Sequence, residues 1–199
     1  MKGIDWNDTD LPPKPTEYGG TEYRSALEAK TAAAFDNLGI PYVYEIDGFK
    51  LRNGMWYKPD FWLPDARMYV ECKGVMDDEA SAKIIGLVEE YSRPVLVLSY
   101  SNAVLVFKDW IDESYGTAEA CGVVEMLTCA KCGTTWFSTP DGSYKCPKCY
   151  ACDGDHHLKR LEVMESGTAL FRLGQAEAAK DPKYTELTKI FNETNDKEN

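Results

Sequence analysis

The sequence lacks long apolar runs and is poor in positive charge. No uninterrupted apolar stretch approaches the roughly 18 residues that a membrane-spanning helix needs. The first ten residues, MKGIDWNDTD, are too acidic for a secretory signal peptide. Lys and Arg number 22 against 33 Asp and Glu, for a net charge of −11. These absences argue against a membrane protein and a broad basic surface, and they predict a cytoplasmic protein.

The charge is unevenly distributed along the chain. Residues 1–128 carry 12 Lys and Arg against 22 Asp and Glu, whereas residues 129–160 carry 5 against 3. Residues 161–199 are acidic again, with 5 against 8. If the protein binds nucleic acid, metal ions and local geometry must therefore offset an unfavourable overall field.

The stretch Lys58–Gly74, KPDFWLPDARMYVECKG, contains two short runs with strand character separated by a Pro-Asp turn. A hairpin closed at the centre of this turn opposes residues whose numbers sum to 131, so Asp60 faces Glu71. Side chains alternate along a strand, which places Asp60, Glu71 and Lys73 on one face. Opposed Cβ atoms lie roughly 4.5–5.5 Å apart, and two carboxylates that close repel unless a cation or a proton separates them. The hairpin is therefore a candidate metal site.

The other patterns predict a helix, three or four strands, a second helix and a further strand. Ser25 and Glu28 have the spacing of a capping box for the first helix, which Gly39 would end. Asp77 or Asp78 would cap the second helix, which runs to about Tyr91. Besides the hairpin, strands are expected over residues 42–46, 49–52, 95–100 and 104–107. This order suggests an α/β fold around a mixed sheet.

The predicted organisation has five parts. They are an extended arm over 1–20, an α/β domain over 21–108, a connector over 109–128, a cysteine-rich module over 129–157, and C-terminal helices with a polar tail over 158–199. Within these parts, a short helix is expected near Thr117–Ala120, and longer helices over Leu158–Leu173 and Pro182–Asn192.

The cysteine-rich module contains two C-x-x-C pairs, Cys129 with Cys132 and Cys146 with Cys149, separated by thirteen residues. In a reducing compartment this spacing indicates a zinc ribbon rather than disulfides. Four thiolates satisfy tetrahedral Zn²⁺ and leave no open position, so the ion would be structural.

Three further residues remain alternative zinc ligands: Cys152, His156 and His157. Basic and aromatic residues are interleaved around the two pairs, a composition that suits contact with DNA or RNA. They are Lys131, Lys145, Lys148, Lys159, Arg160, Trp136, Phe137, Tyr144 and Tyr150. The alternative is that the aromatic residues pack beneath the ribbon and the cations are merely solvated.

With these elements placed, Pro59-Asp60, ten intervening residues and Glu71-Cys72-Lys73 resemble the signature of the PD-(D/E)xK nuclease superfamily. The segment Tyr23–Glu28 is similar to the first-helix segment of many phage-encoded members, which often carry an acidic residue there. The resemblance covers about residues 21–108 and implies a restriction-endonuclease-like α-β-β-β-α-β core.

The resemblance also implies a chemistry. Asp60 and Glu71 would bind Mg²⁺ or Mn²⁺, with the backbone carbonyl of Cys72 as a third protein ligand. Lys73 would orient the attacking water or stabilise the transition-state charge. Glu28 would complete the acidic cluster, through a water or a second ion.

The Gln-x-x-x-Tyr motif of RecB-type exonucleases is absent, because Leu87 stands four residues before Tyr91. This favours an endonuclease acting on DNA, including branched or single-stranded DNA, although the choice between DNA and RNA stays open. The zinc ribbon would help to bind the nucleic acid. Many members act as dimers, so a homodimer is also left open.

Other interpretations compete with the nuclease. Asp60, Glu71 and Lys73 form a structural ion-pair group in one of them, and Glu28 serves only as a helix cap. The protein would then be a non-catalytic nucleic-acid or protein-binding adaptor that retains a nuclease-like fold. A third interpretation is an acidic domain that mimics DNA.

Overall fold

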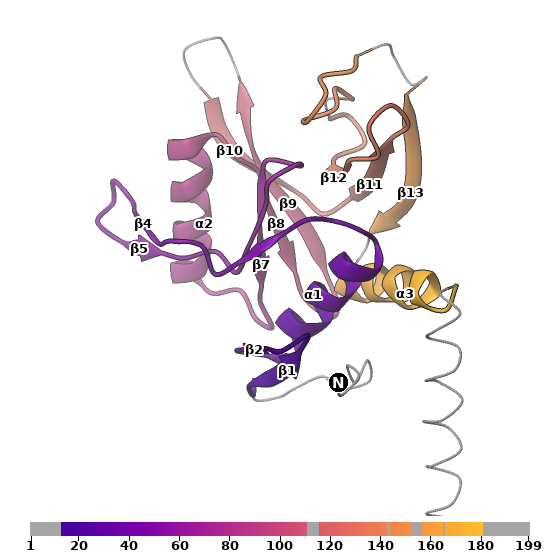
Figure 1. Cartoon of the computed structure of the whole chain (residues 1–199). Coiled ribbons are helices and arrows are strands. Elements are labelled where there is room, and N and C mark those ends of the chain that lie inside the picture. Colours follow the sequence, from indigo (N-terminus) through magenta and orange to yellow (C-terminus); the bar gives the residue numbers. More distant parts are fainter. Residues whose placement is uncertain (1–12, 111–115, 143, 153–156, 165, 181–199) are drawn as a thin grey trace, which may run out of the picture.

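The computed structural model describes residues 13–110, 116–142, 144–152, 157–164 and 166–180, and within them the chain is mixed α/β (Figure 1). A six-stranded sheet has the order β10-β9-β8-β7-β6-β3, in which β7 and β8 are parallel and all other neighbours are antiparallel. Its strands are β3 (Val43–Tyr44), β6 (Phe61–Leu63), β7 (Met68–Cys72), β8 (Val95–Leu98), β9 (Ala103–Trp110) and β10 (Gly116–Cys121). The helices are α1 (Ala26–Asn37), α2 (Asp78–Tyr91) and α3 (Gly167–Ala178).

Three smaller sheets surround the large one. Two are two-stranded ribbons: β1 (Thr16–Tyr18) with β2 (Thr21–Tyr23), and β4 (Phe49–Lys50) with β5 (Trp56–Tyr57). The third has the order β12-β11-β13, formed by β12 (Thr135–Ser138), β11 (Val124–Cys129) and β13 (Leu158–Met164). None of the helices in the described ranges is long and apolar enough to cross a membrane.

The two faces of the large sheet are covered differently (Figure 1). Helix α2 and the β4–β5 ribbon pack on one face, and the core there includes Leu87, Tyr69 and Val97. Helices α1 and α3 and the three-stranded sheet pack on the other face, where one continuous apolar core extends from Phe35 to Met126. The cysteine-rich module therefore shares its core with α1 and α3.

The predicted register of the central hairpin is confirmed. Strands β6 and β7 pair Phe61 with Val70 and Trp62 with Tyr69, so the numbers of opposed residues sum to 131 as expected. The predicted caps are also confirmed. The Ser25 side chain accepts a hydrogen bond from the Glu28 amide, and α2 begins directly after Asp77.

Two helix predictions are wrong. Residues 117–120 lie in β10, because pairing along β9 outweighs the helix propensity of this Ala- and Glu-containing stretch. Residues 158–164 form β13, and only the region from Gly167 onward is helical. The expected connector over 109–128 thus carries all of β10 and most of β11, while the expected helix over 182–192 lies outside the described residues.

A β-bulge explains the second error. The pairing of β13 with β11 shifts between Met126 and Leu127, so that Leu161 is the extra residue on β13. Leu158, Leu161 and Met164 all turn toward the core as a result. Their spacing of three residues imitates one face of a helix, whereas an unbroken strand would alternate.

Gly174 is predicted to be essential for the close packing of α3 on α1. A Cβ atom at this position would lie 2.8 Å from Ala34 Cα and 3.0 Å from Ala34 Cβ. Gly174→Ala should therefore lower the free energy of unfolding by about 1–3 kcal/mol, although alanine is the better helix former. Chemical denaturation measures this change. Gly122→Ala is the control, because its Cβ would meet nothing within 4 Å, and equal stability of both variants would contradict the expectation.

Candidate functional site

Three acidic side chains from separate elements converge at one end of the central hairpin. Glu28 lies in the first turn of α1, Asp60 directly precedes β6, and Glu71 lies in β7. All three are buried, with exposed fractions of 5%, 2% and 3%. The structure thus brings together the three carboxylates that were singled out from the sequence, and it places Lys73 beside them, its Nζ 3.2 Å from Glu71 Oε1.

Asp60 is held from two sides. Its Oδ2 accepts a hydrogen bond from the backbone N–H of Cys72 at 2.7 Å, across the hairpin. Its Oδ1 accepts one from the guanidinium of Arg24. The Cys72 side chain turns to the opposite face, toward Thr31 of α1, so this residue serves the site through its backbone. The predicted metal contact of the Cys72 carbonyl stays a prediction.

Glu71 is held by a tyrosine and a lysine. The Tyr57 hydroxyl donates a hydrogen bond to Glu71 Oε2 at 2.8 Å, and Lys73 contacts Oε1. Because Tyr57 belongs to β5, this bond ties the β4–β5 ribbon to the central sheet. The orientation of Glu71 is therefore fixed on both oxygens.

Glu28 belongs both to the N-terminal cap of α1 and to the acidic cluster. Its amide donates to the Ser25 hydroxyl at 3.1 Å, and that hydroxyl donates to Glu28 Oε1 at 3.0 Å. Its other oxygen accepts from the Tyr44 hydroxyl at 2.6 Å and lies 3.7 Å from Arg24 Nε. The helix cap consequently does not remove this carboxylate from the acidic cluster.

The electrostatics of the cluster show an excess of buried negative charge. Burial raises the pKa of Asp60 well above its ordinary value, and the charges of Glu71 and Glu28 raise it further, against the opposing effects of the Cys72 amide and Arg24. Burial lowers the pKa of Lys73, but Glu71 and Asp60 outweigh it and the pKa is raised. Lys73 is therefore firmly cationic, and Asp60 is stabilised by any cation that approaches it.

A cleft of about 330 Å³ opens above Glu71, between β5, the end of β7 and the start of α2. Four cations line it: Arg24, Lys58, Lys73 and Lys83. Asp77 and Glu79 also line the cleft, and Trp56 and Tyr57 form part of its wall. In a chain of net charge −11, this cleft thus brings four cations together with three acids above the buried carboxylates.

Sequence reasoning missed four residues of this site: Arg24, Tyr44, Glu45 and Tyr57. Arg24 Nε lies 3.1 Å from Glu45 Oε1, and Lys58 Nζ lies 3.0 Å from Glu45 Oε2. The i, i+4 spacing of Arg24 and Glu28 could have indicated from the sequence that these two residues form an ion pair. Glu45 has a left-handed backbone (φ 49°) that follows β3, and nothing in its sequence context indicates this conformation.

The donor chemistry of the acidic cluster fits Mg²⁺ or Mn²⁺, since both ions prefer carboxylate and carbonyl oxygens. The carboxylates are not, however, gathered as tightly as the cysteines described next. Within the described ranges, the cysteine group alone has three or more ligating side chains whose atoms all lie within 4.8 Å of one another. The three carboxylates are instead balanced in part by two cations, since Arg24 pairs with Asp60 and Lys73 pairs with Glu71.

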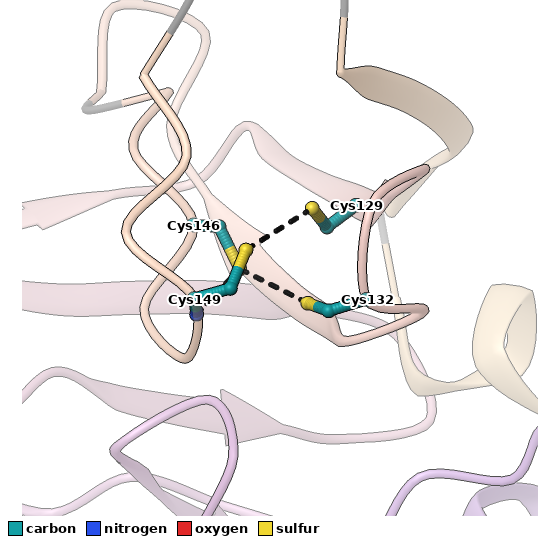
Figure 2. A group of neighbouring side chains, drawn as sticks. All are labelled: Cys129, Cys132, Cys146 and Cys149. Carbon is teal, nitrogen blue, oxygen red and sulfur yellow. Dashed lines mark hydrogen bonds between the residues drawn. The ribbon is translucent and has the colours of Figure 1, made fainter.

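Cys129, Cys132, Cys146 and Cys149 point their sulfur atoms toward one another (Figure 2). The Sγ atoms of Cys129 and Cys149 lie 3.7 Å apart, and those of Cys132 and Cys146 lie 3.6 Å apart. Tetrahedral zinc with Zn–S bonds of about 2.3 Å separates its sulfurs by about 3.8 Å. These four cysteines are therefore positioned to hold a metal ion such as zinc.

The backbone forms the same turn at both cysteine pairs. Gly133 and Tyr150, each directly after the second cysteine of a pair, have left-handed φ angles of 75° and 60°. Their amides donate hydrogen bonds to the carbonyls of Cys129 and Cys146 at 2.7 and 3.0 Å. Two matching knuckles thus aim two sulfurs each at one centre.

The alternative ligands do not join the cluster in the described part of the chain. Cys152 is exposed and lies outside the group of four. His157 is buried, and its Nε2 lies 2.9 Å from the Tyr144 carbonyl. His156 lies outside the described residues.

Most of the basic and aromatic residues around the knuckles have structural contacts. Trp136 and Phe137 are buried, whereas Lys148 pairs with Asp65 at 2.6 Å and Arg160 pairs with Glu125 at 3.0 Å. Tyr150 differs, because half of its surface is exposed and cations lie over its ring. Those cations are Lys145, at 5.2 Å, and Arg67, at 5.1 Å.

Comparison of the chain with protein-family models, curated proteins and solved structures found no match. Function is therefore inferred from the chemistry of the two centres described above. One is a buried acidic cluster beneath a cationic cleft, and the other is a group of four cysteines.

Replacing the buried Asp60 charge is predicted to stabilise the metal-free protein. The raised pKa means that the folded state holds this proton more tightly than an unfolded chain does. The protonated Asp60 carboxyl therefore stabilises the folded state at low pH. This stabilisation is lost as the pH rises from about 4, the pKa in the unfolded chain, through the higher pKa in the folded state. In EDTA at neutral pH, Asp60→Asn should thus have a higher free energy of unfolding than the natural protein. Thermal unfolding from pH 4 to 8 measures this, with the exposed Asp47→Asn as control; parallel curves for Asp60→Asn and the natural protein would contradict it.

Cys132→Ser is predicted to remove a metal ion and weaken the shared core. Elemental analysis should find about one zinc per chain in the natural protein and a large loss in the variant. The free energy of unfolding should fall by several kcal/mol, because a site of this size derives its folding energy from the ion. Cys152→Ser is the matched control and should keep both zinc and stability. Equal zinc content in the two variants would contradict the four-cysteine site.

Proposed function

We propose that this protein is a metal-dependent endonuclease that hydrolyses phosphodiester bonds of DNA. The observation that carries the proposal is the buried pair Asp60 and Glu71, with Lys73 3.2 Å from Glu71, beneath a cleft lined by cations. An isolated structural ion pair would not require a cleft above it. A hydrolase for a polyanion requires one, together with a cation to balance the acids.

The order of elements supports the resemblance to PD-(D/E)xK nucleases. Helix α1 is followed by the antiparallel strands β3, β6 and β7, and then by α2 and by β8, which is parallel to β7. Apart from the β4–β5 ribbon, which lies between β3 and β6 in the chain, this order is consistent with the proposed succession of helix, meander, helix and strand. The expected motif lies at the point where β6 and β7 meet the start of α1.

Each residue of the site has a proposed role. Asp60, Glu71 and the Cys72 carbonyl would hold Mg²⁺ or Mn²⁺, an ion that, when bound, stabilises charge on the phosphate and acidifies water. Lys73, kept cationic by Glu71 and Asp60, would orient the attacking water or stabilise negative charge that develops on the phosphate. Glu28 would complete the cluster.

Arg24, Lys58 and Lys83 would bind the phosphates that flank the scissile bond. The Arg24 side chain is 58% exposed, so its guanidinium can exchange the Asp60 carboxylate for a phosphate without breaking a packed core. Lys58 and Lys83 likewise have acidic partners, Glu45 and Glu79, that a phosphate would replace. Phosphates bound by these cations would face less of the repulsion that the acidity of residues 1–128 creates.

The cysteine group would hold a structural zinc ion. It would also position the nucleic acid through Tyr150 and the adjacent Lys145 and Arg67, which pair an exposed aromatic ring with two cations. Residues elsewhere on this module contribute less, because Lys148 and Arg160 already pair with acids and Trp136 is buried.

A second candidate function is a non-catalytic adaptor with a nuclease-like fold. The contact between Arg24 and Asp60 favours it, since a guanidinium that neutralises the acid also lowers the demand for a metal ion. Calorimetry with Mn²⁺ separates the two functions. An endonuclease should bind the ion, and Asp60→Ala should abolish the heat; an adaptor should show none with either protein.

Lys73→Ala is predicted to lower the rate of DNA cleavage at least about a hundredfold, because it removes the cation nearest to Glu71. The assay incubates the full-length protein with plasmid, single-stranded and branched DNA in Mg²⁺ or Mn²⁺. Lys180→Ala is the control, because Lys180 is exposed beside Glu177 at the end of α3. Unchanged cleavage by Lys73→Ala or by Asp60→Ala would refute the site assignment, and the absence of cleavage by the natural protein would refute the function.

A further inference from the structure

We propose that Trp56 stacks on an unpaired base next to the scissile phosphate, so that the preferred substrate is DNA with unpaired nucleotides. This inference rests on the proposed function and specifies its substrate class. It concerns a residue outside the acidic cluster, on the β4–β5 ribbon at the rim of the same cleft.

The exposure of Trp56 is unusual for its chemistry. Its side chain is 65% exposed, although tryptophan is one of the residues whose burial contributes most to a core. It pairs with Lys50 on the short ribbon. A large aromatic surface left in water beside a charged cleft is available for a ligand that has an aromatic face of its own.

The residue that follows Trp56 links the β4–β5 ribbon to the acidic cluster. The next residue, Tyr57, is buried and donates its hydroxyl to Glu71 Oε2 at 2.8 Å. Gly48 is near the indole, since a Cβ added there would be 3.9 Å from Trp56 Cε3. Trp56 lines the same cleft as Glu71.

The surroundings of Trp56 match the chemistry of a single nucleic-acid strand. The cleft also presents Arg24, Lys58, Lys73 and Lys83, which attract the phosphate backbone. A cationic groove with an aromatic platform is the combination that binds single strands, because every base has a face on which to stack.

A base within an intact duplex would not stack on the Trp56 indole. Both faces of a base in a duplex are already stacked on neighbours, and exposing one costs a few kcal/mol. Trp56 should consequently add affinity for single strands, flaps and frayed ends, but little for an intact duplex. The cations, by contrast, should act on both kinds of DNA, because both carry phosphates.

The test is metal-free binding of the full-length protein, measured by fluorescence anisotropy with a labelled single strand and a duplex of the same sequence. Trp56→Ala should weaken binding of the single strand by roughly 5- to 150-fold, the range for loss of one stacked base. Duplex binding should stay within about twofold, and Trp56→Tyr should restore most of the loss. Lys58→Ala should weaken both substrates by a similar factor.

A stability measurement and a control variant separate loss of stacking from loss of folding. Trp56 is exposed, so Trp56→Ala should leave the thermal midpoint unchanged, and a lowered midpoint together with equal loss on both substrates would overturn the inference. Val123→Ala is the control, since Val123 is an exposed apolar residue that does not line this cleft. Single-strand affinity that is unchanged in Trp56→Ala would also overturn it, and would leave the ring as a contact for another protein.

Cleavage in Mn²⁺ separates the two proposals. If the natural protein cleaves DNA and Trp56→Ala keeps the same preference between single strand and duplex, the stacking role is wrong and the nuclease stands. If the natural protein binds single strands through Trp56 but cleaves neither substrate, the nuclease is wrong and the stacking role stands.

Discussion

The need to balance buried negative charge at the end of the β6–β7 hairpin governs the arrangement of the functional site. Asp60 and Glu71 share that end with Glu28, and burial alone would make three carboxylates there prohibitively costly. Hydrogen-bond donors and cations from four different elements therefore converge on them: Arg24 ahead of α1, the Tyr44 and Tyr57 hydroxyls, the Cys72 amide and Lys73. The fold maintains this cluster although burial of the charges costs stability.

The cysteine group also requires its negative charge to be balanced, in this case by a bound metal ion. Four sulfurs lie together where two knuckles meet, and they can serve as thiolates only if a soft cation neutralises them. This centre is joined to the large sheet by a continuous core that includes Cys129, Cys146 and α3. Loss of the cysteine centre should thus also destabilise the sheet and helix α1, which carry the acidic cluster.

Local rules predicted much of this structure correctly. The hairpin register followed from strand alternation about a Pro-Asp turn, and the helix starts followed from Ser25 and Asp77. The four cysteines were identified from spacing alone. Such features depend on residues near in sequence, or on a single symmetric pairing, so their physics is contained in the local pattern. The strand β13 was missed because its bulge gives a helical spacing of apolar residues.

The carboxylate pair, the group of four cysteines and the helix caps can be predicted from the sequence, because each depends on short-range geometry. The tertiary structure sets which cations and hydroxyls meet the acids. Arg24 and Asp60 are 36 residues apart, and Tyr57 reaches Glu71 only because the β4–β5 ribbon folds over the sheet. It also decided that Trp136 is buried whereas Trp56 is left at the rim of the cleft. Long-range packing sets these contacts, and no local pattern in the chain records which distant surface a side chain will meet.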